Sequence, residues 1–281
     1  MISIIICSRK ADIPQELKQN IAQTIGCKYE LCVIDNSRDE YNIFTAYNEG
    51  VRRAKGDVLC FMHEDVLFHT EGWGKIIKNQ LEDKTIGVIG FAGTHFMPSC
   101  PLYWWHSPFI SQYNLQTDKG VTIHNNSVDY FHGQLADVVA VDGLCFFMPR
   151  RLFEKVRFDE DTYNGFHAYD MDICMQVIQR GLRVCVSRCI LVEHFWSEES
   201  IRNETYIKML YTNLQLFYSK WKSKLPIYVG IEESEYAMQR LNNLCIQVYE
   251  AYSVRNSLAY RLGKALLHLN KYNLKRLFRK L

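Results

Sequence analysis

Short apolar runs alternate with amphipathic stretches over the first 93 residues. The apolar runs are rich in β-branched residues and too short for buried helices, so they predict strands at 2–7, 29–34, 58–62 and 86–91. The stretches between them predict helices at about 12–24, 44–54 and 72–83. Strands and helices that alternate in this way are joined by right-handed crossovers. This half of the chain is therefore expected to be α/β, with a mostly parallel, Rossmann-like sheet.

The alternation stops after Gly93. Residues 94–131 contain prolines, tryptophans and asparagines without a sustained period, which predicts a long loop or flap. A strand is expected at 138–148, interrupted by Asp142 and Gly143, where the backbone can come close to a bound group.

Helical periodicity returns next, and the spacing of apolar residues predicts a helix that begins at about Asp170 and is capped by Gly181. Strands are expected after it at 183–187 and 190–193. Residues 199–281 have the pattern of a helical region, with helices at 200–221, 232–252 and 257–281.

Charge separates this C-terminal region from the rest of the chain. From Ala251 onward there are eight Lys or Arg residues and no Asp or Glu, and the overall net charge of +2 leaves −6 for the first 250 residues. The basic amphipathic segment 255–281 can lie on an anionic membrane, pack on the rest of the chain, or join two copies of the chain in a homodimer.

Composition narrows the class of protein. A hydrophobic fraction of 48% with 23% charged residues is typical of a globular protein, and the near-neutral charge argues against nucleic-acid binding. The ten cysteines form no Cys-x-x-Cys pair, which favours a reducing compartment. No signal peptide and no run of ~18 apolar residues is present, so a cytoplasmic location is expected.

Candidate binding residues follow the predicted strands. Ser8, Asp35 and the run His63-Glu64-Asp65 each come directly after a strand. Parallel strands end at one edge of a sheet, and that edge is where ligands bind in open α/β sheets. Trp104 and Trp105 can form an aromatic platform for a flat ligand or simply pack within the expected loop.

Four pieces of sequence, in their order and spacing, resemble the family-2-like glycosyltransferases of the GT-A fold. They are the strand ending at Ser8, the strand 29–37 with Asp35, the stretch from Asn48-Glu49-Gly50 into the third strand, and Asp170-Met171-Asp172 before a helix ending at Arg180-Gly181. The resemblance covers about 2–196. It implies a GT-A catalytic domain at 1–198, with a nucleotide-sugar half at about 1–93 and an acceptor half at about 94–198, followed by the helical region 199–281.

The resemblance also implies roles for individual residues. His63 stands where the common Asp-x-Asp motif begins, as in a subset of the family with His-x-Asp, and Tyr169 stands where a glutamate often precedes the base. Asp170 is the expected catalytic base, with Asp172 as a rival. The other expected roles are donor binding by Ser8, Asp35, Asn48, His63 and Glu64, metal binding by His63, Asp65 and His194, and acceptor binding by Trp104, Trp105, Asp142, Gly143 and Asp172.

These features predict an inverting, metal-dependent glycosyltransferase of surface polysaccharide synthesis. It would move a sugar from a nucleotide-diphosphate sugar, UDP being favoured, to a hydroxyl of a glycan or lipid-linked acceptor. Mg²⁺ or Mn²⁺ suits the oxygen ligands, and an imidazole favours Mn²⁺. Two alternatives remain: a nucleotide-sugar binding protein without transferase activity, and a sugar nucleotidyltransferase. The second is disfavoured because residues 8–12 contain no glycine-rich phosphate cradle.

Overall fold

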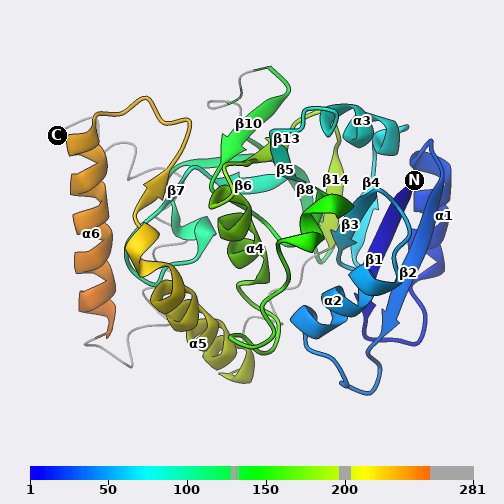
Figure 1. Ribbon diagram of the computed structural model, residues 1–281, viewed down its shortest axis with the longest axis horizontal. Helices are drawn as coiled ribbons and strands as arrows, with labels where there is room; N and C mark the ends of the chain where they lie inside the picture. The colour runs from blue at the N-terminus through cyan, green and yellow to red at the C-terminus, as the bar shows by residue number, and fades with distance from the viewer. Residues whose placement is uncertain (128–130, 132, 196–203, 254–281) are drawn as a thin grey trace.

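The computed structural model describes residues 1–127, 131, 133–195 and 204–253 (Figure 1). Its core is a seven-stranded sheet. The strands are β1 (Ile2–Ser8), β2 (Tyr29–Asp35), β3 (Val58–Met62), β5 (Ile86–Gly90), β10 (Leu135–Val138), β12 (Cys145–Pro149) and β13 (Arg183–Ser187). Their order across the sheet is β10-β13-β5-β12-β3-β1-β2.

Helices cover both faces of this sheet. They are α1 (Gln15–Thr24), α2 (Ile43–Arg53), α3 (Trp73–Gln80) and α4 (Tyr169–Ile178). Buried side chains of α2 and α4 share one core cluster with Phe61 of β3, whereas those of α1 and α3 share the other with Cys60. Successive side chains of a strand point to opposite faces, so a strand covered on both sides is apolar throughout. This explains the continuous apolar runs in the sequence.

Five of the seven strands run in the same direction. β1 is parallel to β2 and β3, and β13 is parallel to β5, as predicted. The other two strands, β12 between β3 and β5 and β10 beside β13, run in the opposite direction, so the sheet is mostly parallel, as expected. An apolar run shows that a strand is buried but does not show which way it runs.

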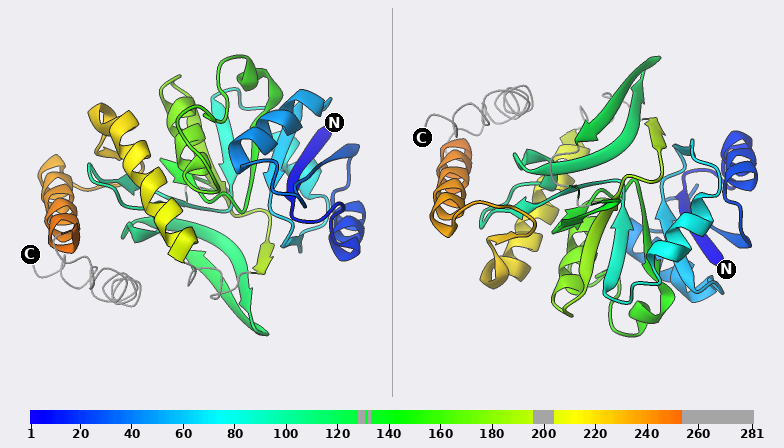
Figure 2. Two further views of the ribbon diagram at one scale, coloured as in Figure 1. Left: turned by 90° about the horizontal axis from the view of Figure 1, so that it is seen from below. Right: turned by 90° about the horizontal axis from the view of Figure 1, so that it is seen from above.

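A second sheet takes up much of the C-terminal part of the segment 94–131, which was expected to be a long loop or flap, so that prediction was wrong for residues 110–127. Its strands are β4 (Val66–Phe68), β6 (Ala92–Thr94), β8 (Ile110–Asp118), β11 (Ala140–Val141) and β14 (Val192–Phe195), with β9 (Val121–Ser127) paired to β8. The β8–β9 hairpin, drawn in green, extends away from the body of the molecule (Figure 2). β9 is largely exposed and polar, which is why the segment lacks the pattern of a buried strand.

Short elements and the C-terminal helices complete the described structure. They are β7 (Phe96–Met97), the 3₁₀ helices η1 (Trp104–His106), η2 (Arg150–Glu154) and η4 (Lys222–Lys224), α5 (Glu204–Trp221), β15 (Ile227–Tyr228) and α6 (Glu235–Ser253). β15 pairs with β7, and Leu214 and Phe217 of α5 belong to the same buried cluster as α4. α5 therefore packs as part of the same body as the central sheet.

The two long C-terminal helices confirm the helical region expected from the sequence. The expected domain boundary at 198 and the basic segment 255–281 lie outside the described residues, so both stay predictions. No helix in the described part of the chain is long and apolar enough to cross a membrane.

Candidate active site

The ends of three neighbouring strands carry a group of polar side chains at one edge of the central sheet. Ser8 ends β1 and lies opposite Asp35, the last residue of β2. Glu64 lies just beyond the end of β3. Its Oε2 atom accepts a hydrogen bond from the Ser8 hydroxyl at 2.6 Å, and its Oε1 atom accepts one from Arg9 Nε at 3.0 Å. The structure thus brings together Ser8, Asp35 and Glu64, three of the residues expected to bind the donor.

Asp35 is the most accessible of these side chains. The hydroxyl and the backbone N–H of Ser37 donate to its carboxylate, and these bonds hold the pKa of Asp35 below its ordinary value. An open cavity of about 340 Å³ lies beside it, formed by the end of β2, the loop at 37–41 and Arg53 of α2. Asp35 is therefore ionised and free to accept hydrogen bonds from a ligand at this edge.

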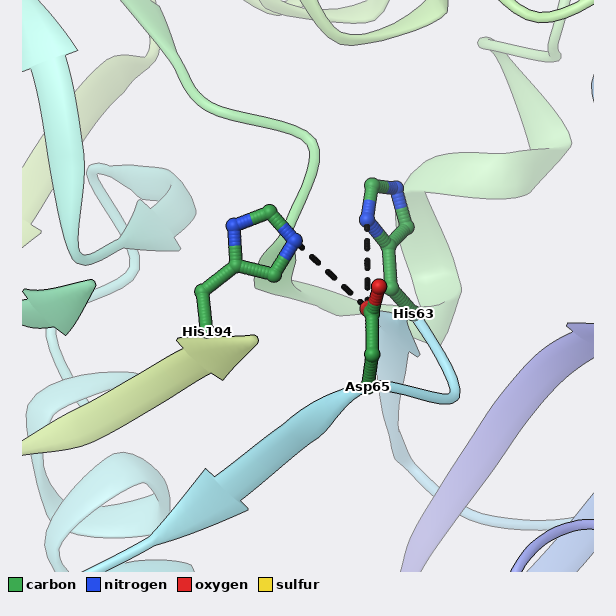
Figure 3. A group of neighbouring side chains, drawn as sticks. All are labelled: His63, Asp65 and His194. Carbon is green, nitrogen blue, oxygen red and sulfur yellow. Dashed lines mark ion pairs between the residues drawn. The ribbon is translucent and has the colours of Figure 1, made fainter. Parts of the chain in front are cut away.

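Two histidines and one aspartate converge next to this edge (Figure 3). His63 directly follows β3, Asp65 precedes β4, and His194 lies on β14, which is antiparallel to β4. Asp65 Oδ1 lies 3.5 Å from His194 Nε2 and 3.9 Å from His63 Nδ1. One ligand atom from each residue fits within a span of 4.8 Å. The β4–β14 pairing thus places residues more than a hundred positions apart around one point.

The chemistry of this trio fits a divalent metal ion. Asp65 Oδ1 is buried, and its nearest nitrogen partners are too far away for a strong hydrogen bond. Burial lowers the pKa of His63 to about 4, so its imidazole is neutral and keeps a lone pair for a metal. Burial also lowers the pKa of His194. The hydrogen bond and the negative charge of Asp65 raise it by more, so the pKa of His194 lies above its ordinary value. Two imidazoles and a carboxylate suit Mn²⁺ and other first-row divalent ions.

Tyr169, the first residue of α4, connects this trio to the base expected next to it. Its Oη atom lies 2.7 Å from His63 Nε2 and donates to the Gly143 carbonyl at 3.1 Å. Gly143 sits in the break between β11 and β12, where a Cβ atom would come within 2.1 Å of the Tyr169 Oη atom. A side chain at position 143 would displace the tyrosine, which explains the glycine.

Asp170 lies buried at the start of α4. Its carboxylate accepts hydrogen bonds from the backbone N–H of Gly143 at 3.2 Å and of Met171 at 2.8 Å. Burial, and then the neighbouring charge of Asp142, raise the pKa of Asp170 to about 7. Burial also raises the pKa of Asp142. A carboxyl group with a pKa close to neutral suits general-base catalysis.

The backbone that leads into α4 adopts an unusual conformation. Ala168 has a φ of 70°, a left-handed value that costs a residue with a Cβ atom of order 1 kcal/mol or more. Its N–H donates to the Tyr103 hydroxyl at 2.8 Å. Strain of this kind persists where the surroundings hold it, and it is concentrated at functional sites.

Asn48 and Asp172 are engaged in contacts within the protein. The Asn48 side chain donates to the Phe158 carbonyl and to Glu160 Oε2, both at 2.8 Å, and so ties α2 to the loop before α4. The buried Asp172 carboxylate accepts hydrogen bonds from four side chains: Tyr163, Gln176, Lys220 and Trp221. Both side chains hold parts of the protein together, and their hydrogen-bonding groups are already used within the protein.

The expected aromatic platform is not formed by Trp104. Its side chain is 5% exposed and belongs to the main core cluster, because η1 turns it inward. The Trp105 ring is partly buried and stacks on Tyr103 with their centroids 3.9 Å apart. Packing within the protein, the other reading of these tryptophans, fits Trp104 better.

Sequence reasoning missed the aromatic side chain that does lie beside the metal-binding trio. Phe166 is 40% exposed, and its ring centroid is 5.3 Å from that of His63. It stands in an irregular segment, where no periodicity could reveal its orientation. Tyr206 of α5 was also missed. Its ring packs edge-on against His167 at 4.4 Å, and Asp142 and Asp170 contribute to raising the pKa of its hydroxyl after burial.

Three solved structures are similar to the chain at low identity. GalNAc-T7, crystallised with UDP, GalNAc and Mn²⁺, is 14% identical, with a TM-score of 0.49 over 69% of this chain and 43% of that one. A197 from STIV is 14% identical, with a TM-score of 0.43 over 69% of this chain and 85% of that one. S. aureus TarS 1–349 is 11% identical, with a TM-score of 0.47 over 69% of this chain and 60% of that one. These likenesses are too distant to transfer any property, and this chain spans less than half of the first.

The family assignment comes from a different comparison. No curated protein matches the chain. A family model described as "Glycosyltransferase like family" matches residues 3–221, more than three quarters of the sequence and the whole of the site described above. This match confirms the predicted family and, with the observed architecture, the predicted GT-A fold with its helical C-terminal region. The chain belongs to the glycosyltransferase-like family 2.

Proposed function

We propose that the protein is an inverting glycosyltransferase. It moves a sugar from a nucleotide-diphosphate sugar, with UDP as the favoured carrier, to a hydroxyl of a glycan or lipid-linked acceptor in surface polysaccharide synthesis. The family supports glycosyl transfer in general. The finer statements rest on the site.

The observation that carries this proposal is the position and pKa of Asp170. It is buried, has a pKa of about 7, and is linked through Gly143 and Tyr169 to the group His63, Asp65 and His194. A base of this kind takes the proton from an acceptor hydroxyl as that hydroxyl attacks the anomeric carbon. Attack from the side opposite the leaving diphosphate inverts the configuration.

The donor is expected to lie along the edge formed by Ser8, Asp35 and Glu64. The ionised Asp35 would accept hydrogen bonds from the nucleoside. His63, Asp65 and His194 would hold Mn²⁺ or Mg²⁺, and the two imidazoles favour Mn²⁺. A divalent ion supplies Lewis-acid stabilisation of the charge that develops on the leaving diphosphate.

The acceptor is expected on the side of Phe166. This exposed ring lies beside His63 and, with its centroid 5.9 Å from that of Tyr169, close to the residue before the base. An exposed aromatic ring at the mouth of a polar site suits packing against the face of a sugar. Asp142, the residue before Gly143, is expected to contact the acceptor in the same region.

Membrane contact through 255–281, a homodimer and a cytoplasmic location stay predictions.

Calorimetric titration of the purified protein with UDP, GDP, dTDP and CMP, each with and without Mn²⁺, tests the donor site. The expected result is binding of one diphosphate, UDP first, that depends on the metal. Absence of binding to every nucleotide would contradict the proposal. Incubation with the matching nucleotide sugar, whose sugar passes to an added glycan or to water, is followed by detection of the released nucleoside diphosphate. Comparison of the wild type with Asp170→Asn then separates an enzyme from a binding protein.

A further inference from the structure

We infer that Tyr169 is a positioning residue that keeps the ring proton of His63 on Nε2 and so presents the Nδ1 lone pair toward Asp65 and His194. The inference rests on the proposed function only for the metal that this lone pair would bind. The observation behind it is the place of the Tyr169 hydroxyl between two partners, His63 Nε2 at 2.7 Å and the Gly143 carbonyl at 3.1 Å.

The hydrogen-bonding capacity of the three groups assigns the proton. A carbonyl oxygen can only accept, and a phenol has a single proton to donate. When Tyr169 donates to the Gly143 carbonyl, its oxygen is left to accept from His63, so Nε2 must carry the hydrogen. All three groups are then satisfied, as buried polar groups generally are.

The opposite tautomer satisfies fewer groups. Tyr169 would then donate to His63 Nε2, and the Gly143 carbonyl would lose this donor. The proton would move to His63 Nδ1, which is 3.9 Å from Asp65 Oδ1 and beyond hydrogen-bond distance. A protonated Nδ1 would also have no lone pair for a metal, although this nitrogen points toward Asp65 (Figure 3).

Packing holds the tyrosine in place. Tyr169 is 3% exposed, and its ring lies edge-on to Tyr47 and Phe44 with centroids 5.5 and 6.4 Å away. Gly143 leaves room for the hydroxyl, since a Cβ atom there would lie 2.1 Å from it. A ligand histidine oriented by a fixed second partner is a common arrangement in metal sites.

A tyrosine also suits the charges around it. A carboxylate at position 169 could accept the same hydrogen bond, but it would add a third negative charge beside Asp142 and Asp170. The phenol orients the imidazole and remains neutral. Because the Gly143 carbonyl accepts from Tyr169 and the Gly143 N–H donates to Asp170, the backbone of one residue positions both the metal ligand and the base.

The test uses the full-length protein and the substitution Tyr169→Phe, which removes only the hydroxyl. The matched control is Tyr163→Phe, another buried tyrosine, whose hydroxyl donates to Asp172 at 3.0 Å and not to His63. Nitrogen-15 NMR of the metal-free protein, labelled at histidine and assigned with His63→Gln, reports which ring nitrogen of His63 is protonated. Calorimetry with Mn²⁺ alone measures metal affinity.

The wild type and Tyr163→Phe should show His63 protonated on Nε2, and Tyr169→Phe should lose this preference and bind Mn²⁺ about 10- to 100-fold more weakly. Protonation of His63 on Nδ1 in the wild type would overturn the inference, as would a Tyr169→Phe protein that matches the wild type in both measurements. A wild type with the Nε2 tautomer that binds no Mn²⁺ would support the tautomer assignment but refute the proposed metal and the role of Tyr169 toward it.

Discussion

The backbone N–H of Gly143 donates to Asp170 Oδ2 at 3.2 Å, and this bond joins the break between β11 and β12 to the first turn of α4. Asp142 precedes this glycine and shares the buried environment of Asp170. The base is therefore held by a peptide from another part of the chain, and its pKa depends on that neighbour.

Asp170→Asn is expected to lower kcat by about 10²- to 10⁴-fold, because the amide cannot take a proton. It keeps one of the two oxygens that accept backbone hydrogen bonds. Turnover of nucleotide sugar, with the thermal melting curve as a check on folding, measures this. Asp172→Asn is the matched comparison. It should lower the melting temperature clearly and have only a small effect on kcat. A variant of Asp170 that keeps more than about a tenth of the activity would exclude it as the base.

The activity is expected to depend on the protonation of Asp170. Its pKa of about 7 lies above that of an ordinary carboxyl group, so below this pH the protonated form, which cannot act as a base, predominates. A plot of log kcat/KM against pH should therefore rise with a slope of about one below pH 7 and level off above it. Asp142→Asn removes the neighbouring charge and should move the rise to lower pH. An unchanged profile in this variant would show that Asp142 does not set the pKa.

His194→Ala should lower the affinity for Mn²⁺ more than about tenfold, because it removes one of the three proposed protein ligands. His69→Ala is the control, because this histidine is half-exposed and its Nε2 atom lies 2.8 Å from Glu193 instead of facing Asp65. Calorimetry of both variants with Mn²⁺, and the effect of EDTA on wild-type turnover, measure the difference. Equal affinity in the two variants would place the metal elsewhere.

Phe166→Ala is expected to raise the KM for the acceptor by about fivefold, equivalent to about 1 kcal/mol, and to leave the affinity for nucleotide unchanged. The reason is the exposed ring beside His63. Tyr236→Ala on α6 removes an aromatic ring that is 71% exposed and serves as the control. A Phe166 variant with a normal acceptor KM but weaker nucleotide binding would move this ring to the donor side.

Lys220→Met is expected to lower the free energy of unfolding by about 2–3 kcal/mol, because it leaves the buried carboxylate of Asp172 without its cationic partner at 2.8 Å. Lys220 is 27% exposed, so the effect should be smaller than for a fully buried pair. Urea denaturation measures it, and the exposed Lys222→Met is the control. Equal midpoints for the two variants would show that α5 is not anchored through this pair.

The sequence by itself determined four strands and three helices of the first 93 residues and the start of α4, but not the short strands β4 and β6. Apolar runs, amphipathic stretches and the residues that end them act over a few neighbouring positions, so they can be read without knowledge of the fold. The same local reading placed Ser8, Asp35 and His63 at strand ends and therefore at one edge. It also singled out Asp65, whereas the resemblance to the family-2-like glycosyltransferases pointed to Asp170 and His194 as candidates for the site.

Only the tertiary structure decided which of these candidates meet, and how. It placed β12 antiparallel between β3 and β5, paired β8 with β14, buried Trp104 and engaged Asp172 with α5. It also joined Tyr169 to His63, 106 positions away. These outcomes depend on pairings between distant segments, whose energies come from packing and burial in three dimensions and leave no period in the local sequence.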